Sequence, residues 1–119
     1  MGRILVAEDE VMLRIIAVEM LEDAGFTVFQ AGDGEEALAV LKANPGIDLL
    51  VSDVKMPRMD GYALVQAGRD FNPDLKVLLM TGYAQEPPAS VAALKGVMTL
   101  HKPFNLDRLC ELAGEMLAG

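Results

Sequence analysis

Acidic side chains stand at the ends of two apolar segments of this sequence. Glu8 and Asp9 directly follow the segment Arg3 to Ala7, and Asp53 ends the segment that begins at Leu49. Carboxylates that lie close together repel one another and raise one another's pKa values unless a cation joins them. A cluster of oxygen ligands suits Mg²⁺, a hard ion that keeps some of its waters when it binds. These three acids therefore predict a magnesium site.

A hydroxyl and an ammonium group stand at the ends of two further apolar segments, at Thr81 and Lys102. An aspartate such as Asp53 can attack phosphorus and form an aspartyl phosphate. The ammonium and hydroxyl groups would then neutralise and orient the phosphoryl oxygens, and Gly82 leaves room for the phosphoryl group to enter. The combined set predicts phosphoryl chemistry on an aspartate.

Each of these residues has an ordinary explanation when it is taken singly. An acid at a strand end is usually a solvated loop residue, Thr81 alone would be a cap or turn residue, and Lys102 alone a surface charge. Asp60, before Gly61, is expected to form a turn rather than to bind a metal. His101 is expected to be structural or exposed, because no Cys or second His stands at a ligand spacing. The functional prediction depends on the combination.

Five short apolar segments, bounded by turn-forming residues, predict β-strands over residues 3–7, 26–31, 48–53, 76–80 and 97–101. The segment around Leu49 is apolar throughout, as in a strand that is buried on both faces of a parallel sheet. Helical periodicity predicts helices over 10–24, 35–43, 62–71 and 89–94, and a last one after its cap Asn105. The fourth helix should be short, because Pro87 and Pro88 precede it.

The alternation of strands and helices predicts an α/β fold, with a doubly wound parallel sheet of five strands and five helices on its two faces. The carboxyl ends of parallel strands share one edge, and ligands of open α/β sheets bind there. The fold should therefore bring Glu8, Asp53, Thr81 and Lys102 to one rim. The loop after Asp53, in which Pro57 fixes one backbone angle, should hold a constant shape over the acid.

The first predicted helix is amphipathic. Apolar residues recur there every three or four positions, and polar residues such as Arg14 take the other face. The apolar positions expected to pack are Met12, Leu13, Ile15, Ile16, Met20 and Leu21. The eight Met residues of the chain are expected to fill the core rather than to form a binding surface.

The composition narrows the possible classes of function. A chain of 119 residues, 52% of them hydrophobic, is expected to form one domain over residues 1–119. The net charge of −8 disfavours nucleic acid and anionic membranes as partners, and no apolar stretch approaches the about 18 residues of a membrane span. The lone Cys110 excludes an intrachain disulfide and indicates a reducing compartment, the cytoplasm.

In order and spacing, these motifs resemble the receiver domain of bacterial two-component response regulators. The resemblance covers essentially the whole chain and depends on Glu8-Asp9, Asp53 with Met56-Pro57-Arg58-Met59-Asp60-Gly61 behind it, Thr81-Gly82, and Lys102-Pro103-Phe104. It implies a flavodoxin-like sheet with the strand order 2-1-3-4-5. It also implies a phosphoacceptor switch in a phosphorelay, with a histidine kinase or histidine phosphotransfer protein as donor and a downstream protein as target.

The resemblance implies roles for the acidic residues. Asp53 would be the phosphoacceptor, in a domain that assists its own phosphorylation and dephosphorylation and is not an enzyme in the usual sense. Asp9, Asp53 and the backbone carbonyl of Lys55 would ligate Mg²⁺. Glu8 would act on the ion through a bound water, and the pair Glu8-Asp9 replaces the commoner Asp-Asp.

The resemblance also implies how the phosphoryl group is held and sensed. Thr81 and Lys102 would bind it, and a cis peptide bond before Pro103 would aim Lys102 inward. Many receivers carry a Tyr or Phe at the position of Thr99, where it rotates inward on phosphorylation. Because Thr99 lacks a ring, Thr81 and Tyr83 become the candidate switch residues. The run Thr-Gly-Tyr-Ala resembles receivers of hybrid histidine kinases and of some stand-alone alphaproteobacterial-type regulators.

The sequence leaves two alternative functions to consider. One is an aspartate-nucleophile phosphatase of the haloacid-dehalogenase type, which uses a second acid two residues after the nucleophile, where this chain has Lys55. That type also usually carries a cap domain, for which these residues leave no room. The other is an interaction module that never meets phosphate, and the presence of Asp53, Thr81 and Lys102 counts against it.

Overall fold

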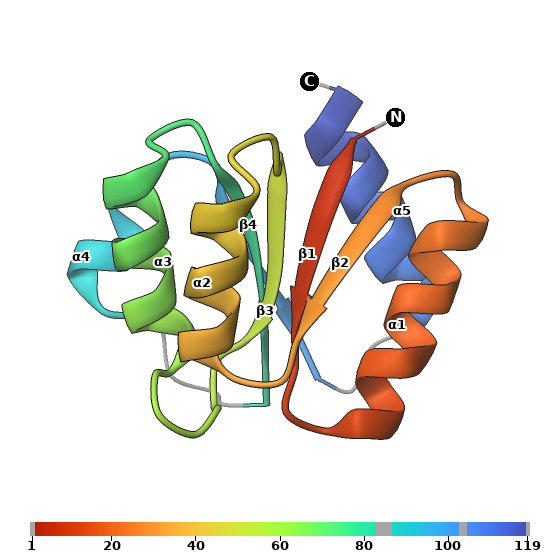
Figure 1. The fold of residues 1–119 in the computed structure, drawn as a ribbon, viewed down its shortest axis with the longest axis horizontal. Helices are drawn as coiled ribbons and strands as arrows, with labels where there is room; N and C mark the ends of the chain where they lie inside the picture. Colours follow the sequence, from red (N-terminus) through yellow and green to blue (C-terminus); the bar gives the residue numbers. More distant parts are fainter. Residues whose placement is uncertain (1, 83–86, 103–104, 119) are drawn as a thin grey trace.

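The chain forms a sheet of five parallel strands in the order β2-β1-β3-β4-β5, with helices between the strands (Figure 1). The computed structural model describes residues 2–82, 87–102 and 105–118. The strands are β1 (Arg3–Ala7), β2 (Thr27–Ala31), β3 (Leu49–Asp53), β4 (Lys76–Thr81) and β5 (Val97–His101). The helices are α1 (Val11–Asp23), α2 (Gly34–Ala43), α3 (Gly61–Phe71), α4 (Ala89–Ala92) and α5 (Leu106–Ala118). The predicted doubly wound fold and its strand order are confirmed.

The helices cover both faces of the sheet. In Figure 1, α1 and α5 lie on one side of the strands, and α2, α3 and α4 lie on the other. Alternate residues of β1 therefore enter two separate hydrophobic clusters, Leu5 and Ala7 under α2 and α3, and Ile4 and Val6 under α1 and α5. All residues of β3 are buried, as predicted for the central strand.

Side-chain caps fix where several helices begin. Asp33 and Asp60 are the N-caps of α2 and α3, and each accepts a backbone hydrogen bond from the first turn at 2.8 Å. Asn105 accepts the backbone N–H of Asp107 at 2.8 Å, which confirms its predicted capping role. Asp60 is therefore the N-cap of α3, a role that the sequence analysis did not assign to it.

The packing of α1 differs from the prediction. Its buried residues are Ala17, Val18 and Leu21, whereas Met12 is 66% and Ile15 is 41% exposed. The prediction of a packed apolar face was wrong for Met12, Ile15 and Ile16, because helical spacing places them on the side opposite the buried stripe. Apolar residues therefore occupy two sides of this helix, and only one of them meets the sheet.

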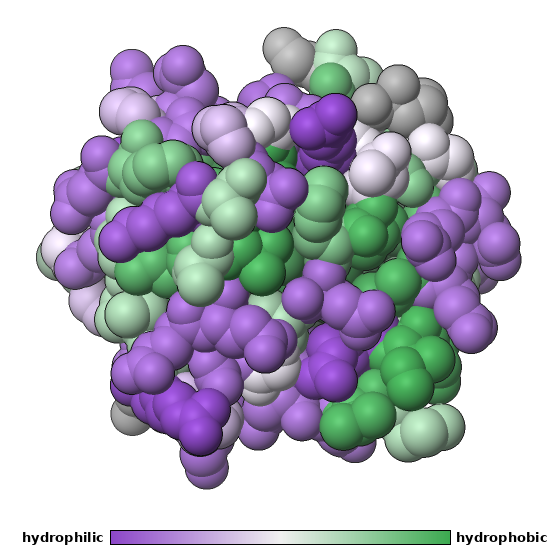
Figure 2. Space-filling model, in the orientation of Figure 1, coloured by the Kyte–Doolittle hydropathy of each residue, from purple (hydrophilic) through white to green (hydrophobic). Residues whose placement is uncertain are grey.

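The exposed apolar side of α1 forms a surface that we call the α1 patch, made of Val11, Met12, Ile15 and Ile16. Figure 2 shows apolar atoms gathered on the side of the molecule where α1 lies. Met98 of β5 is also exposed, at 45%. The expectation that the methionines fill the core was therefore wrong for Met12 and Met98.

The helix α4 is the shortest in the described residues and ends at Ala92, two residues before the predicted boundary. Its first residue follows Pro88, whose φ of −53° suits a helix start. None of the helices in the described part of the chain has both the length and the apolar character needed to cross a bilayer.

Candidate functional site

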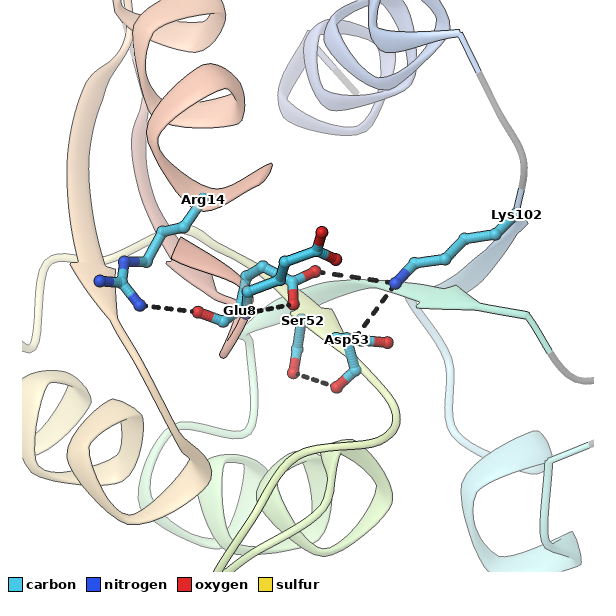
Figure 3. A network of polar contacts seen from close by, with 6 residues as sticks. Glu8, Arg14, Ser52, Asp53 and Lys102 are labelled. Carbon is cyan, nitrogen blue, oxygen red and sulfur yellow. Dashed lines mark hydrogen bonds and ion pairs between the residues drawn. The ribbon is translucent and has the colours of Figure 1, made fainter. Parts of the chain in front are cut away.

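Lys102 extends from the end of β5 toward two acids at the same edge of the sheet (Figure 3). Its Nζ lies 3.1 Å from Oδ2 of Asp53 and 3.7 Å from Oε1 of Glu8. Glu8 directly follows β1 and Asp53 ends β3. The parallel sheet thus brings the carboxyl ends of three strands, and the charges they carry, within contact distance.

Glu8 is buried, with 1% of its surface exposed. Its Oε2 accepts the backbone N–H of Glu10 at 3.0 Å, whereas Oε1 has no hydrogen-bond partner among the described residues. Burial raises the pKa of Glu8 to about 7; the Glu10 N–H opposes this shift, and the negative charge of Asp53 adds to it. This carboxyl group therefore holds its proton far more readily than an ordinary glutamate.

Lys102 partly balances the two acids. Burial alone would lower the pKa of Lys102, but its hydrogen bond to Asp53 and the attraction of Asp53 and Glu8 outweigh burial, so its pKa lies above the ordinary value. The side chain is therefore a permanent cation at neutral pH. One ammonium group against two buried carboxylates still leaves the site with an excess of negative charge.

Glu8, Asp9 and Asp53 form a group that fits a metal ion. Each offers a carboxylate oxygen, and these oxygens all lie within 4.8 Å of one another. Asp9 is exposed, while Glu8 and Asp53 are buried. The buried Oε1 of Glu8, which accepts no hydrogen bond in the described part of the chain, is free to bind a cation or a water on it. Three hard oxygen donors of this kind match the preference of Mg²⁺.

Thr81 and Lys55 lie at the same edge of the sheet as these charges. Thr81 is buried at the end of β4, and its carbonyl accepts the backbone N–H of Lys102 at 2.7 Å. Lys55 lines the same pocket as Glu8, Asp9, Asp53 and Lys102. All the predicted site residues that the structure describes therefore meet at one rim of the sheet.

Two predictions fall outside the described residues. Tyr83, the second candidate switch residue, and the peptide bond before Pro103 are not among them. The ammonium group of Lys102 is among the described atoms, and it points toward Glu8 and Asp53.

Arg14 is a site residue that the sequence analysis missed. Its Nη1 donates to the backbone carbonyl of Glu8 at 2.9 Å (Figure 3). Its Nε donates to Oε1 of Gln30 at 3.2 Å. Arg14 thereby ties the loop of Glu8 and Asp9 to the neighbouring strand β2. The sequence placed Arg14 only on the polar face of a helix; its place in the first turn of the helix that follows the acidic pair was the available signal.

Comparisons with known proteins agree with this geometry. Residues 4–113 match the family described as the response regulator receiver domain. The chain is 38% identical to the response regulator receiver protein CpdR of Brucella abortus, over 98% of each chain. It is 39% identical to the sensor kinase CckA of Brucella abortus, over 96% of this chain but only 12% of the kinase.

A solved structure gives the same result at the level of the fold. The response regulator TrrA of Thermotoga maritima, in complex with Mg²⁺ and a beryllium fluoride, superposes with a TM-score of 0.85. It is 30% identical in sequence, and the match covers 98% of this chain and 99% of that one. The matched residues, the fold and the similarity to CpdR over 98% of its length show that this chain belongs to the receiver domain family of two-component response regulators.

Proposed function

We propose that this chain is the phosphoacceptor switch of a two-component phosphorelay and that Asp53 receives the phosphoryl group. The observation that carries the proposal is the ammonium group of Lys102, placed 3.1 Å from Asp53 and 3.7 Å from Glu8. A fixed cation beside a carboxylate is suited to neutralise phosphoryl oxygens as they arrive. Asp53 is buried but lines a pocket at the carboxyl edge of the sheet, and a donor could approach it through this pocket.

In the proposed step, the phosphoryl group moves from an atom of the donor to a carboxylate oxygen of Asp53. A carboxylate oxygen of Asp53 forms a bond to phosphorus as the bond between phosphorus and the donor atom breaks, and the donor leaves with the electron pair of that bond. For a histidine donor, the leaving atom is an imidazole nitrogen. The ammonium group of Lys102 and the hydroxyl of Thr81 then donate hydrogen bonds to the phosphoryl oxygens.

The acidic group is the proposed magnesium site. Asp9, Asp53 and the backbone carbonyl of Lys55 would hold the ion directly, and Glu8 would act through a bound water. When bound, Mg²⁺ supplies positive charge that stabilises the phosphoryl oxygens during transfer. Two observations on the described residues support this: the close approach of the three carboxylates, and the buried Oε1 of Glu8, which accepts no hydrogen bond there.

We also propose that the phosphoryl donor is a histidine kinase or a histidine phosphotransfer protein and that it docks over the α1 patch. The patch begins two residues after Asp9, so a protein seated on it would stand next to Asp53. Ile15→Asp should then slow transfer from a phosphorylated histidine kinase and leave the reaction with a small acyl phosphate unchanged. Equal slowing of both reactions would show damage to the site and would contradict docking at the patch.

We infer that residues 1–119 act as a single receiver domain, which assists its own phosphorylation and dephosphorylation and whose output is contact with a downstream protein. The thiol of Cys110 is free, which suits a reducing compartment such as the cytoplasm.

The signal is proposed to leave through the end of β4. Thr81 ends this strand, and a movement of its hydroxyl toward a phosphoryl group would displace the segment that leads through Tyr83 to α4. Amide shifts in unmodified and beryllium fluoride-bound protein test this route. Residues 87–95 should shift in the wild type and shift little in Thr81→Ala; large shifts confined to α1 or α3 would contradict it.

The central test uses a small acyl phosphate with Mg²⁺, because the positioning groups belong to the receiver itself. Intact mass should show one added phosphoryl group in the wild type and none in Asp53→Ala. Asp70→Ala removes an exposed acid of α3 and is the matched control, which should be modified like the wild type. Absence of the added mass in the wild type, or its persistence in Asp53→Ala, would overturn the proposal.

A further inference from the structure

The loop between β3 and α3, residues 54–60, forms one wall of the acidic pocket. Three of its residues line the pocket, namely Lys55, Met56 and Pro57. The ends of the loop are tied together, because the backbone N–H of Gly61 donates to the carbonyl of Val54 at 2.7 Å. The position of this loop therefore sets the shape of the pocket beside Asp53.

The middle of the loop is strained at Arg58. Its φ is 70°, in the left-handed region that residues other than glycine seldom adopt. The backbone N–H of Met59 donates to the carbonyl of Pro57 across it, at 2.8 Å. A hydrogen bond between residues i and i+2 around a positive φ marks the rare, strained form of the γ-turn. Such strain persists only where surrounding structure holds it in place.

Asp33, at the start of α2, contacts the strained residue. The Nη1 of Arg58 donates to Oδ2 of Asp33 at 2.5 Å. The other oxygen of Asp33, Oδ1, accepts the backbone N–H of Glu36 at 2.8 Å as the N-cap of α2. Asp33 is nearly buried, whereas the side chain of Arg58 is 64% exposed. The helix therefore fixes the acid, and the loop supplies an arginine that reaches it.

A second contact joins the same two elements. A Cβ atom on Gly34, the first residue of α2, would lie 2.1 Å from the carbonyl oxygen of Met59. The backbone of the loop thus packs directly against the first turn of the helix, at a distance that only glycine allows. The ion pair of Arg58 and this close contact of Met59 both join the strained turn to the start of α2.

We propose that Asp33 and Arg58 form a clamp that positions the β3–α3 loop for the phosphoryl site. The clamp holds the pocket wall, including the backbone of Lys55, in the place from which it can serve the magnesium ion and Asp53. Asp33 and Arg58 are positioning residues, because they act through the loop and line no part of the pocket. This inference rests on the proposed function of the acidic pocket.

If Arg58 acted only through its charge, its removal would change the magnesium affinity in the opposite direction. Removing a cation near a cluster of acids strengthens the attraction of that cluster for Mg²⁺. A loosened loop has the reverse effect, since the ion then loses a well-placed ligand. The sign of the change in magnesium affinity of Arg58→Met therefore separates the clamp from a simple charge effect.

The experiment measures magnesium affinity by amide shift titration, and the denaturation midpoint of each variant. Arg58→Met and Asp33→Asn should each weaken binding about tenfold, the scale found for groups that support metal ligands. Asn at position 33 keeps an oxygen for the helix cap. The double variant should bind no more weakly than the weaker single variant, because both changes break one interaction.

Two further variants complete the design. Arg108→Met removes an arginine that is half exposed and paired with acids on α5, and its magnesium affinity should equal that of the wild type. Arg58→Gly removes the side chain but suits a positive φ, so it should keep the stability of the wild type and still bind Mg²⁺ more weakly. If Arg58→Met fails to fold, the magnesium affinity of Arg58→Gly tests the clamp in its place.

The outcomes separate the two hypotheses. If the wild type binds Mg²⁺ and accepts phosphate while Arg58→Met and Arg58→Gly bind the ion equally or more tightly, the clamp is wrong and the proposed function stands. A loss of affinity that merely follows a loss of folded protein also overturns the clamp. If the wild type neither binds Mg²⁺ nor accepts phosphate, the proposed function fails and the clamp fails with it.

Discussion

Among the described residues, Lys102 is the only cation in contact with two buried acids. Its replacement should slow the transfer of the phosphoryl group. We predict that Lys102→Met slows modification by an acyl phosphate about a hundredfold, the usual scale for removing a group that stabilises developing charge. The rate is measured by intact mass against time. Lys42→Met, which removes an exposed lysine of α2, should react at the wild-type rate. Equal rates in both variants would show that Lys102 only pairs the acids at rest.

Asp9 is the exposed member of the acidic group, and its contribution is to metal binding. We predict that Asp9→Ala and Asp53→Asn each weaken magnesium binding at least about tenfold, because each removes an anionic ligand from a site with few of them. Amide shift titration with Mg²⁺ measures the change. Asp23→Ala, at the far end of α1, is the control for net charge. Undiminished affinity in both site variants would place the ion elsewhere.

At the scale of the element, α1 is stabilised through one narrow stripe. Leu21 is fully buried and Met12 is 66% exposed, although both belong to the apolar pattern of this helix. We predict that Leu21→Ala lowers the free energy of unfolding by about 2–5 kcal/mol, whereas Met12→Ala changes it by less than about 0.5 kcal/mol. Urea denaturation of both variants measures the difference. Comparable losses would mean that the α1 patch is covered in solution.

At the scale of the whole molecule, the pKa of Glu8 makes stability depend on pH. Because this pKa rises from 4.5 to about 7 on folding, the folded protein binds more protons than the unfolded chain between these values. The free energy of unfolding should therefore be highest near pH 4.5 and fall as the pH rises toward 7. The lowered pKa of Asp33 changes stability only below its ordinary value of 3.8, and the raised pKa of Lys102 only above 10.5. Neither group therefore contributes to the change between pH 4.5 and 7.

Urea midpoints measured without Mg²⁺ from pH 4.5 to 7.5 test the dependence. Glu8→Gln, which cannot ionise, should flatten the curve across this range. Added Mg²⁺ should raise the midpoints most at the upper end of the range, since the charged form of Glu8 is the one that an ion stabilises. A midpoint that rises with pH in the wild type would contradict the raised pKa.

Local signals in the sequence were sufficient for the elements and for the candidate site. A strand such as β3 consists of apolar residues that end on an acid, and Asp60 and Asn105 mark helix starts through caps that lie a few residues from their partners. In a parallel sheet, the order of the motifs then determines that their acids, hydroxyl and ammonium share one edge. The α/β fold and the meeting of these residues followed from this pattern, whereas the strand order was implied by the resemblance to receiver domains.

Tertiary structure alone decided the features that depend on residues far apart in the chain. The orientation of α1 on the sheet determined which of its two apolar sides is exposed, because periodicity does not tell one apolar side from another. The burial of Glu8 and its raised pKa arise from neighbours on other strands. The contact between Asp33 and Arg58 joins residues 25 positions apart, and no local pattern pairs one acid with one arginine among so many charges.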